Sequence, residues 1–323
     1  MIGEAGLPRA LLALPVFLVA MAIGFYLLTM PRMLTASDLP AHEPDLVNGE
    51  YMFIAGGCAE CHAAPVKGCD DLNTVDKDVL AGGRCMKTGF GTFHVPNLSP
   101  DQETGIGKWS AVDFVNAMKR GIAPDGSYLY PAFPYTSYQR MSFEDLIDLK
   151  AYLDTLPAVR SEIPPHAIGF PFNIRRGLGL WHKLYLDGES FRPDPAASEA
   201  VNRGGYLVRG PGHCTECHSA RNLIGGIVAP TEFAGAPNPE REGTVPNITP
   251  SADGIGDWTE ADIAYLLETG STPDFDTIGD NMVPVQENMA RLTREDRMAI
   301  AAYLKSLPPR PDAAARRGEG DDQ

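Results

Sequence analysis

The chain has 323 residues, of which 44% are hydrophobic and 21% charged, and its formal net charge is −15. This length suits two modest domains better than one, since a domain usually has about 100–200 residues. The negative charge argues against nucleic acid, because phosphate contacts need clustered Lys and Arg side chains. The acidity would suit a basic partner surface, or it could serve only to keep the chain soluble.

The first predicted element is an apolar run from Ala10 to Met30 that contains no charged residue. A helix needs about 20 apolar residues to cross a bilayer, so residues 1–36 are predicted to form an N-terminal transmembrane anchor. A cleaved signal peptide is the alternative, with Leu34-Thr35-Ala36 as a weak cleavage site. The flanking Arg9 and Arg32 hardly favour either orientation in the membrane.

Residues 37–160 are predicted to form the first domain, which contains the motif Cys58-Ala-Glu-Cys61-His62. Cys-x-x-Cys-His is the attachment signature of c-type haem, in which both thiols bond to the porphyrin and the histidine ligates iron. Zinc sites and thioredoxin-like redox pairs also use Cys-x-x-Cys. Zinc would need a second ligand pair, and a redox pair does not require the histidine, so the motif favours covalent haem c.

Two further cysteines, Cys69 and Cys85, lie in a segment between this motif and Pro96. In an oxidising compartment such a pair most simply forms a disulfide, which would stabilise the loop by about 3 kcal/mol. The alternative is that one of the two ligates iron.

Several helices are predicted from their first residues. A hydroxyl residue three positions before an Asp is typical of a helix N-terminus, because the two side chains satisfy free backbone amides. The predicted starts lie at Ser110, Ser142, Thr259 and Thr293. Pro157 and Pro308 are predicted to end the last helix of each domain, since proline cannot continue a helix.

Residues 161–195 are predicted to form an ordered connector, because this stretch is rich in Pro, Gly and aromatic residues, including Trp181, and a flexible Gly/Ser-rich linker would lack such aromatics. Residues 196–310 are predicted to form the second domain. The tail, residues 311–323, is rich in Ala, Arg, Gly and Asp, a composition that favours disorder.

The second domain repeats the first. Cys214-Thr-Glu-Cys217-His218 repeats the haem motif, and Pro246-Asn247 repeats Pro96-Asn97. Because the blocks keep their order, the sequence indicates a duplicated domain with two haem sites. Haem of this type is attached after export, which predicts a single-pass protein of the inner (plasma) membrane with its haem domains on the periplasmic side.

The sixth iron ligand of the second haem is predicted to be Met282, which lies in the loop before the helix that starts at Thr293. Met289 is closer to that helix and is expected in the core. Methionine paired with histidine fills both axial positions and raises the reduction potential.

The sixth ligand of the first haem is predicted to be Met141. Its counterpart in the repeat is Leu292, so simple packing is the alternative role. His94 and an open coordination position are the rival interpretations of the site, and Met118 is expected in the core.

Each proximal histidine needs a carbonyl to orient its ring, and the segments at Pro96 and Pro246 are the candidates. Trp109 and Trp258, at matched positions, could donate an indole N–H to a haem propionate or pack in the core.

The chain resembles the cytochrome c subunits of membrane-bound bacterial dehydrogenases, which accept electrons from quinoprotein, flavoprotein or molybdenum enzymes. The resemblance implies a mostly α fold of two tandem class I cytochrome c domains, following the N-terminal transmembrane helix. It also implies two covalent haems c, held by Cys58, Cys61, Cys214 and Cys217, with His62 and His218 as proximal ligands. The matching segments are Gly91-Thr-Phe-His-Val-Pro-Asn97, Tyr130-Pro-Ala-Phe-Pro-Tyr135, the connector from Trp181 to Pro195, and Asn202-Arg-Gly-Gly-Tyr-Leu207.

Two departures from the family are visible. Many relatives carry a third haem domain that has no counterpart here, and many have methionine where this chain has Phe133. A methionine at the position of Met141 is usual in the family.

The resulting functional hypothesis is a non-catalytic subunit that receives electrons from a periplasmic dehydrogenase. It would pass them to quinone, a soluble cytochrome or an oxidase. The alternatives are a haem subunit of a terminal oxidase, or a two-haem oxidoreductase that acts on a small substrate at an open haem.

Overall fold

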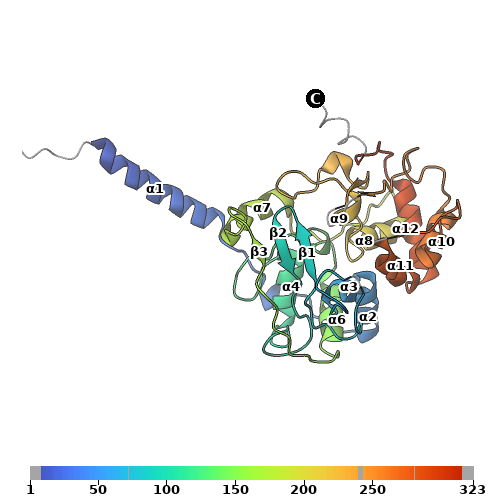
Figure 1. Cartoon of the computed structure of the whole chain (residues 1–323), viewed down its shortest axis with the longest axis horizontal. Coiled ribbons are helices and arrows are strands. Elements are labelled where there is room, and N and C mark those ends of the chain that lie inside the picture. The colour runs from blue at the N-terminus through green and yellow to red at the C-terminus, as the bar shows by residue number, and fades with distance from the viewer. Residues whose placement is uncertain (1–8, 72, 239–242, 280, 315–323) are drawn as a thin grey trace, which may run out of the picture.

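The computed structural model describes residues 9–71, 73–238, 243–279 and 281–314. Helix α1 (Arg9–Leu28) extends away from the rest of the chain, and beyond it two groups of short helices lie next to each other (Figure 1). We call these groups the first unit, from α2 to α6, and the second unit, from α8 to α12.

The helices of the two units follow one another in the same order. The first unit consists of α2 (Leu46–Ala55), α3 (Cys58–His62), α4 (Ala111–Arg120), α5 (Tyr135–Tyr138) and α6 (Phe143–Leu153). The second unit consists of α8 (Glu199–Arg209), α9 (Thr215–His218), α10 (Glu260–Thr269), α11 (Met282–Ala290) and α12 (Arg294–Ser306).

All the helix starts predicted from capping patterns are confirmed. The hydroxyl oxygens of Ser110, Ser142, Thr259 and Thr293 each accept a hydrogen bond from the backbone N–H of the Asp three residues later, at 3.3, 3.0, 3.1 and 3.1 Å. These caps begin α4, α6, α10 and α12. Helices α6 and α12 end at Leu153 and Ser306, shortly before the prolines that predicted their ends.

The first and last helices of each unit cross in close contact at a glycine. A Cβ atom on Gly49 of α2 would lie 2.2 Å from the carbonyl oxygen of Asp148 in α6, and one on Gly204 of α8 would lie 1.9 Å from that of Ala299 in α12. Any larger residue would push the helices apart. The crossing fixes where each Cys-x-x-Cys-His segment, which follows α2 or α8, leaves the core.

Short strands complete the units. Strands β1 (Cys85–Thr88) and β2 (Gly91–His94) form an antiparallel hairpin in which Cys85 is opposite His94, and β3 (Ala167–Ile168) pairs with the other edge of β2. In the second unit β4 (Ala236–Pro237) pairs antiparallel with β5 (Thr244–Val245).

One buried apolar cluster runs through both units. It includes Met52 and Leu146 from the first unit and Leu207 and Ile300 from the second. Met118 and Met289, both expected in the core, are buried members of this cluster. The two units therefore share a continuous hydrophobic core.

The connector between the units contacts both of them. Helix α7 (Leu178–Tyr185) follows the short 3₁₀ helix η2 (Arg175–Gly177). The indole N–H of Trp181 donates to the carbonyl of Ile224 at 2.9 Å, and its ring packs edge-on against Tyr135 of α5. The remaining 3₁₀ helices are η1 (Ala36–Asp38) and η3 (Ala229–Thr231).

The predicted membrane anchor is wrong. A bilayer crossing needs about 20 consecutive apolar residues in one helix, and no helix in the part of the chain that the structure describes is long and apolar enough. This finding overturns the transmembrane helix assigned to residues 1–36 and the single-pass inner-membrane location with periplasmic haem domains. The membrane as a partner is not confirmed. The rest of the predicted fold class agrees with the structure, which consists mostly of helices and loops.

Most of the predicted disordered tail, residues 315–323, lies outside the described residues. Within the described part of this tail, Ala313 is buried, and its backbone N–H donates to the carbonyl of Ala234 at 2.8 Å.

Candidate haem sites

The first haem motif forms the single-turn helix α3. Gly57, in the left-handed conformation with φ of 56°, turns the chain from α2 into this helix. The Nδ1–H of His62 donates to the carbonyl of Pro96 at 2.9 Å. This bond fixes the ring and leaves Nε2 as the nitrogen that can ligate a metal.

The second motif has the same local geometry. Cys214 immediately precedes α9, and His213, at the position equivalent to Gly57, also adopts a left-handed conformation with φ of 39°. The Nδ1–H of His218 donates to the carbonyl of Pro246 at 2.7 Å. The prediction that the Pro96 and Pro246 segments orient the two histidines is confirmed.

Burial sets the protonation of both motifs. It lowers the pKa of His62 and His218 below the ordinary value, even though the carbonyl bonds oppose the shift. The imidazoles are therefore neutral, as metal ligation requires. Burial raises the pKa of Cys58 and Cys214 to about 12, with a smaller contribution from the neighbouring cysteine. Redox-active Cys-x-x-Cys pairs instead have a lowered thiol pKa, so this environment argues against a thioredoxin-like site.

The predicted sixth ligand of the first haem, Met141, lies between α5 and α6 and is 1% exposed. The rival ligand His94 is the last residue of β2 and contacts the connector. Its Nδ1–H donates to the carbonyl of Pro165 at 3.0 Å, and its backbone N–H donates to Nδ1 of His166 at 3.1 Å. Met141 thus belongs to the shared core, whereas His94 is held at the sheet.

The predicted sixth ligand of the second haem, Met282, is the first residue of α11 and is partly buried. The preceding residue, Asn281, has a buried side-chain oxygen with no hydrogen-bond partner among the described residues. Met289, on the last turn of the same helix, is buried in the shared core. Both methionines therefore lie on α11, so the loop position expected for Met282 is wrong, whereas the core position expected for Met289 is confirmed.

The aromatic candidates Trp109 and Trp258 are partly buried and pack against the shared core. This contact agrees with the packing role considered for both of them.

Sequence reasoning missed two acidic residues inside the haem motifs. Glu216 is 9% exposed, and its carboxylate accepts hydrogen bonds from Thr136 and Ser137 of α5 at 2.5 and 2.8 Å. Burial would raise the pKa of Glu216, but the charge of Arg221 and these hydroxyls outweigh it and hold the pKa below its ordinary value. The only signal in the sequence is that Glu60 occupies the same position in the first motif.

Sequence reasoning also missed a buried cation that binds the same backbone position in both units, at Met141 and at its repeat counterpart Leu292. Lys119 of α4 donates to the carbonyl of Met141 at 2.7 Å, and burial lowers the pKa of Lys119 to about 8. In the second unit, Arg297 of α12 donates to the carbonyl of Leu292, the repeat counterpart of Met141, at 2.5 Å. The two units satisfy the same backbone position with cations from different helices, so the repeat alone could not reveal them.

The predicted disulfide between Cys69 and Cys85 is confirmed, with the two Cα atoms 4.9 Å apart. It ties the loop after the first motif to the start of β1. The alternative, in which one of these cysteines ligates iron, is wrong because both sulfurs are in the bridge.

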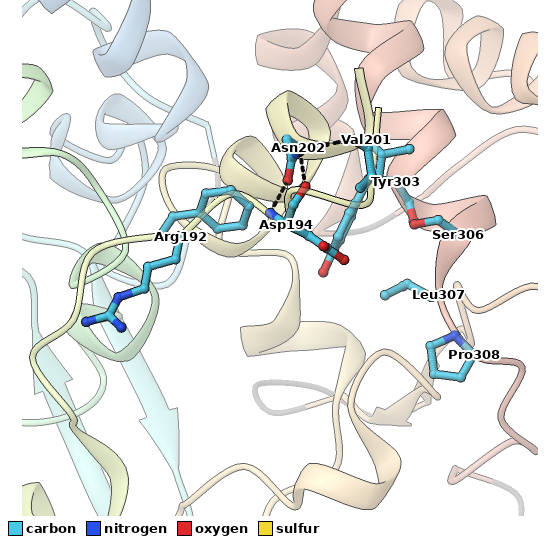
Figure 2. Close-up of a pocket in the computed structure, with 10 residues that line it drawn as sticks. Arg192, Asp194, Val201, Asn202, Tyr303, Ser306, Leu307 and Pro308 are labelled. Carbon is cyan, nitrogen blue, oxygen red and sulfur yellow. Dashed lines mark hydrogen bonds between the residues drawn. The ribbon is translucent and has the colours of Figure 1, made fainter. Parts of the chain in front are cut away.

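A pocket with a volume of about 320 Å³ lies away from both motifs, between the end of the connector and helices α8 and α12 (Figure 2). Asn202 of α8 ties the end of the connector to this helix at one side of the pocket. Its amide oxygen accepts from the backbone N–H of Asp194 at 2.7 Å, and its NH₂ group donates to the Asp194 carbonyl at 2.8 Å. No cysteine or histidine of the haem motifs lines it. The other lining residues are Phe191, Arg192, Ala197, Val201, Tyr303, Ser306, Leu307 and Pro308.

Comparison with known proteins agrees with this geometry. The cytochrome c family matches residues 46–157, which include the whole first unit. A di-haem c-type cytochrome of Cereibacter sphaeroides is 45% identical over 91% of this chain and 96% of its own length. The chain belongs to the di-haem c-type cytochromes. It carries two covalently bound haems c and transfers electrons.

Components of dehydrogenases are also similar to this di-haem cytochrome. One component of the nicotinate dehydrogenase of Pseudomonas putida is 40% identical over 84% of this chain, and the fructose dehydrogenase cytochrome subunit of Gluconobacter japonicus is 34% identical over 84%. The chain spans only 22% and 54% of the lengths of these two relatives. The predicted resemblance to dehydrogenase cytochrome subunits is confirmed.

Proposed function

We propose that this di-haem cytochrome receives electrons from a dehydrogenase subunit and passes them to a respiratory acceptor. The observation that carries the proposal is the pair of matched motifs, each with a neutral histidine oriented by a proline carbonyl. The dehydrogenase is proposed as donor because cytochrome subunits of such enzymes are among the relatives. The acceptor is proposed to be quinone, a soluble cytochrome or an oxidase.

In each unit the two cysteines are proposed to hold haem as thioethers, with the adjacent histidine as the proximal ligand. The first site would consist of Cys58, Cys61 and His62, and the second of Cys214, Cys217 and His218. Bound haem supplies a one-electron iron centre whose potential depends on its axial ligands. The carbonyls of Pro96 and Pro246 hold the imidazole rings and strengthen them as ligands.

Met141 and Met282 are proposed as the sixth ligands, which would leave no open position for a substrate. Met141 is supported by its burial in the shared core and by Lys119, which fixes its backbone carbonyl. Met282 is supported by its place at the start of α11. Two filled axial positions suit electron transfer better than the alternative of a two-haem enzyme.

Carbon monoxide binding tests this ligand arrangement. In the reduced protein both haems should be low-spin and inert to the gas, because both axial positions are filled. Met141→Ala and Met282→Ala should each allow carbon monoxide to bind at one haem, and the core variant Met118→Leu should behave like the parent protein. Stoichiometric binding to the parent would overturn the ligand assignment and favour the enzyme alternative.

Purification of the tagged protein from its native cells tests the donor. We expect a dehydrogenase to copurify and its substrate to reduce both haems, as judged by the visible spectrum. Copurification with oxidase subunits, and oxidation of the haems by oxygen through them, would instead establish the terminal-oxidase alternative.

A further inference from the structure

Glu216 belongs to the second haem motif but binds the first unit. Its Oε1 atom accepts from both hydroxyls of α5, Thr136 at 2.5 Å and Ser137 at 2.8 Å. Ser137 is 2% exposed, so water does not readily replace the carboxylate as its partner. The α5 segment leads within four residues to Met141, the proposed sixth ligand of the first haem.

Glu60 makes the reciprocal contact from the first haem motif. Its Oε1 atom accepts from the side-chain amide of Asn288 in α11 at 3.0 Å and from Lys77 at 2.8 Å. Lys77 also binds Glu287 of α11 at 2.9 Å, so two residues of this helix are tied to the first motif. Helix α11 begins with Met282, the proposed sixth ligand of the second haem.

Both carboxylates are strong acceptors in these contacts. Hydrogen bonds to a charged acceptor are stronger than neutral ones, and removing the acceptor from a buried site leaves its donors unsatisfied. Each carboxylate also has a cation, Arg221 beside Glu216 at 2.5 Å and Lys77 beside Glu60. Each carboxylate therefore has both a cation and the donors of the opposite unit as partners inside the interface.

We propose that Glu60 and Glu216 are reciprocal positioning residues, each of which holds, from its own haem motif, the segment that presents methionine to the other haem. The inference rests on the proposed ligation by Met141 and Met282. If it holds, the iron–methionine bond of each haem depends on a residue in the haem motif of the other unit. Loss of Glu216 should therefore disturb the first haem, although Glu216 is covalently part of the second site.

The test uses the full-length di-haem protein in a Met282→His background, in which the far-red charge-transfer band of an oxidised iron–methionine bond reports the first haem alone. Glu216→Ala should weaken this band and lower the potential of the first haem, because methionine ligation raises the potential. Glu216→Gln keeps the shape and an acceptor oxygen, so it should retain more of the band. The exposed Glu260→Ala of α10 is the matched control and should change neither signal.

The reciprocal experiment uses Met141→His, in which Glu60→Ala should weaken the band of the second haem. If Glu216→Ala fails to fold, Thr136→Val with Ser137→Ala removes the donors from the other side and should weaken the same band of the first haem. An unchanged band and potential of the first haem in the Glu216 variants would overturn the inference while leaving the ligands in place. If Met282→His leaves both methionine bands intact, the ligand assignment itself fails, and the inference fails with it.

Discussion

The hydroxyl of Tyr51 in the first unit donates to the carboxylate of Asp296 in the second at 2.6 Å, and it accepts from the backbone N–H of Thr293 at 3.1 Å. Tyr206, the repeat counterpart of Tyr51, makes the same pair of contacts with Asp145 and Ser142 of the first unit. Each tyrosine thus binds the N-terminus of the last helix of the opposite unit. This reciprocity is typical of two copies related by a twofold axis.

Removal of one of these hydroxyls should weaken the contact between the units. Tyr51→Phe takes one partner from Asp296, which would still bind Arg203 through both oxygens at 2.8 and 2.7 Å. A hydrogen bond to a charged group contributes about 1.5–3 kcal/mol, so the free energy of unfolding should fall by about that amount. Denaturant unfolding measures it, with Tyr265→Phe, an exposed side chain of α10, as the control.

Tyr206→Phe should have a similar effect, because its hydroxyl serves the equivalent helix. If both variants unfold with the parent's midpoint and slope, the tyrosines do not hold the units together.

The glycines at the helix crossings allow a second prediction. In Gly49→Ala and Gly204→Ala the new methyl group would meet a backbone carbonyl at 2.2 and 1.9 Å. A backbone atom cannot move aside as a flexible side chain can, so the loss of stability should be at least the 1–3 kcal/mol or so that is typical of overpacking. Thermal unfolding followed by haem absorbance measures the loss. Gly177→Ala, at a site with open space around it, should leave the melting temperature unchanged.

The features that the sequence predicted are local. A cap needs a hydroxyl and a carboxylate three residues apart, as at Ser142 and Asp145, and the haem motif needs five consecutive residues. The Cys69–Cys85 bridge was predictable because these two cysteines remain after the haem motifs are assigned.

The features that it missed depend on the packing of one unit on the other. Spacing along the chain does not reveal that Glu216 contacts α5 or that Lys119 lies behind Met141, since the partners are 80 and 22 residues away. The membrane anchor was predicted from the length of the apolar run alone, and the described helices do not meet the requirement for a bilayer crossing.

The disulfide should contribute to stability through the loop that it closes. Cys69 and Cys85 are 16 residues apart in sequence, and closing a loop of this size stabilises the folded state by about 3 kcal/mol in the chain-entropy description. Cys69→Ser with Cys85→Ser should lower the free energy of unfolding by about that amount and leave the haem content unchanged. Mild reduction of the parent should reproduce the loss, because thioether bonds to haem resist it. Equal stability of the parent with and without reductant would contradict the prediction.

The buried histidine of the connector predicts a specific dependence of stability on pH. His182 is 9% exposed, its Nε2 lies 3.1 Å from the hydroxyl of Tyr135, and burial lowers its pKa from 6.5 to about 4. The unfolded chain binds the proton of this histidine more tightly than the folded chain does. The stability that comes from the buried neutral ring is therefore fully present above pH 6.5 or so and is lost as the pH falls towards about 4. The difference between the two pKa values corresponds to about 3 kcal/mol.

His182→Gln can still donate to Tyr135 but does not titrate, so its free energy of unfolding should fall less steeply between about pH 6.5 and 4 than that of the parent. Denaturant unfolding at a series of pH values gives both slopes. Lys183→Gln, on the adjacent residue of α7, keeps the histidine and should retain the parent's slope. Parallel curves for His182→Gln and the parent would mean that the connector opens before His182 is protonated. In that case α7 would not stabilise the contact between the two haem units at low pH.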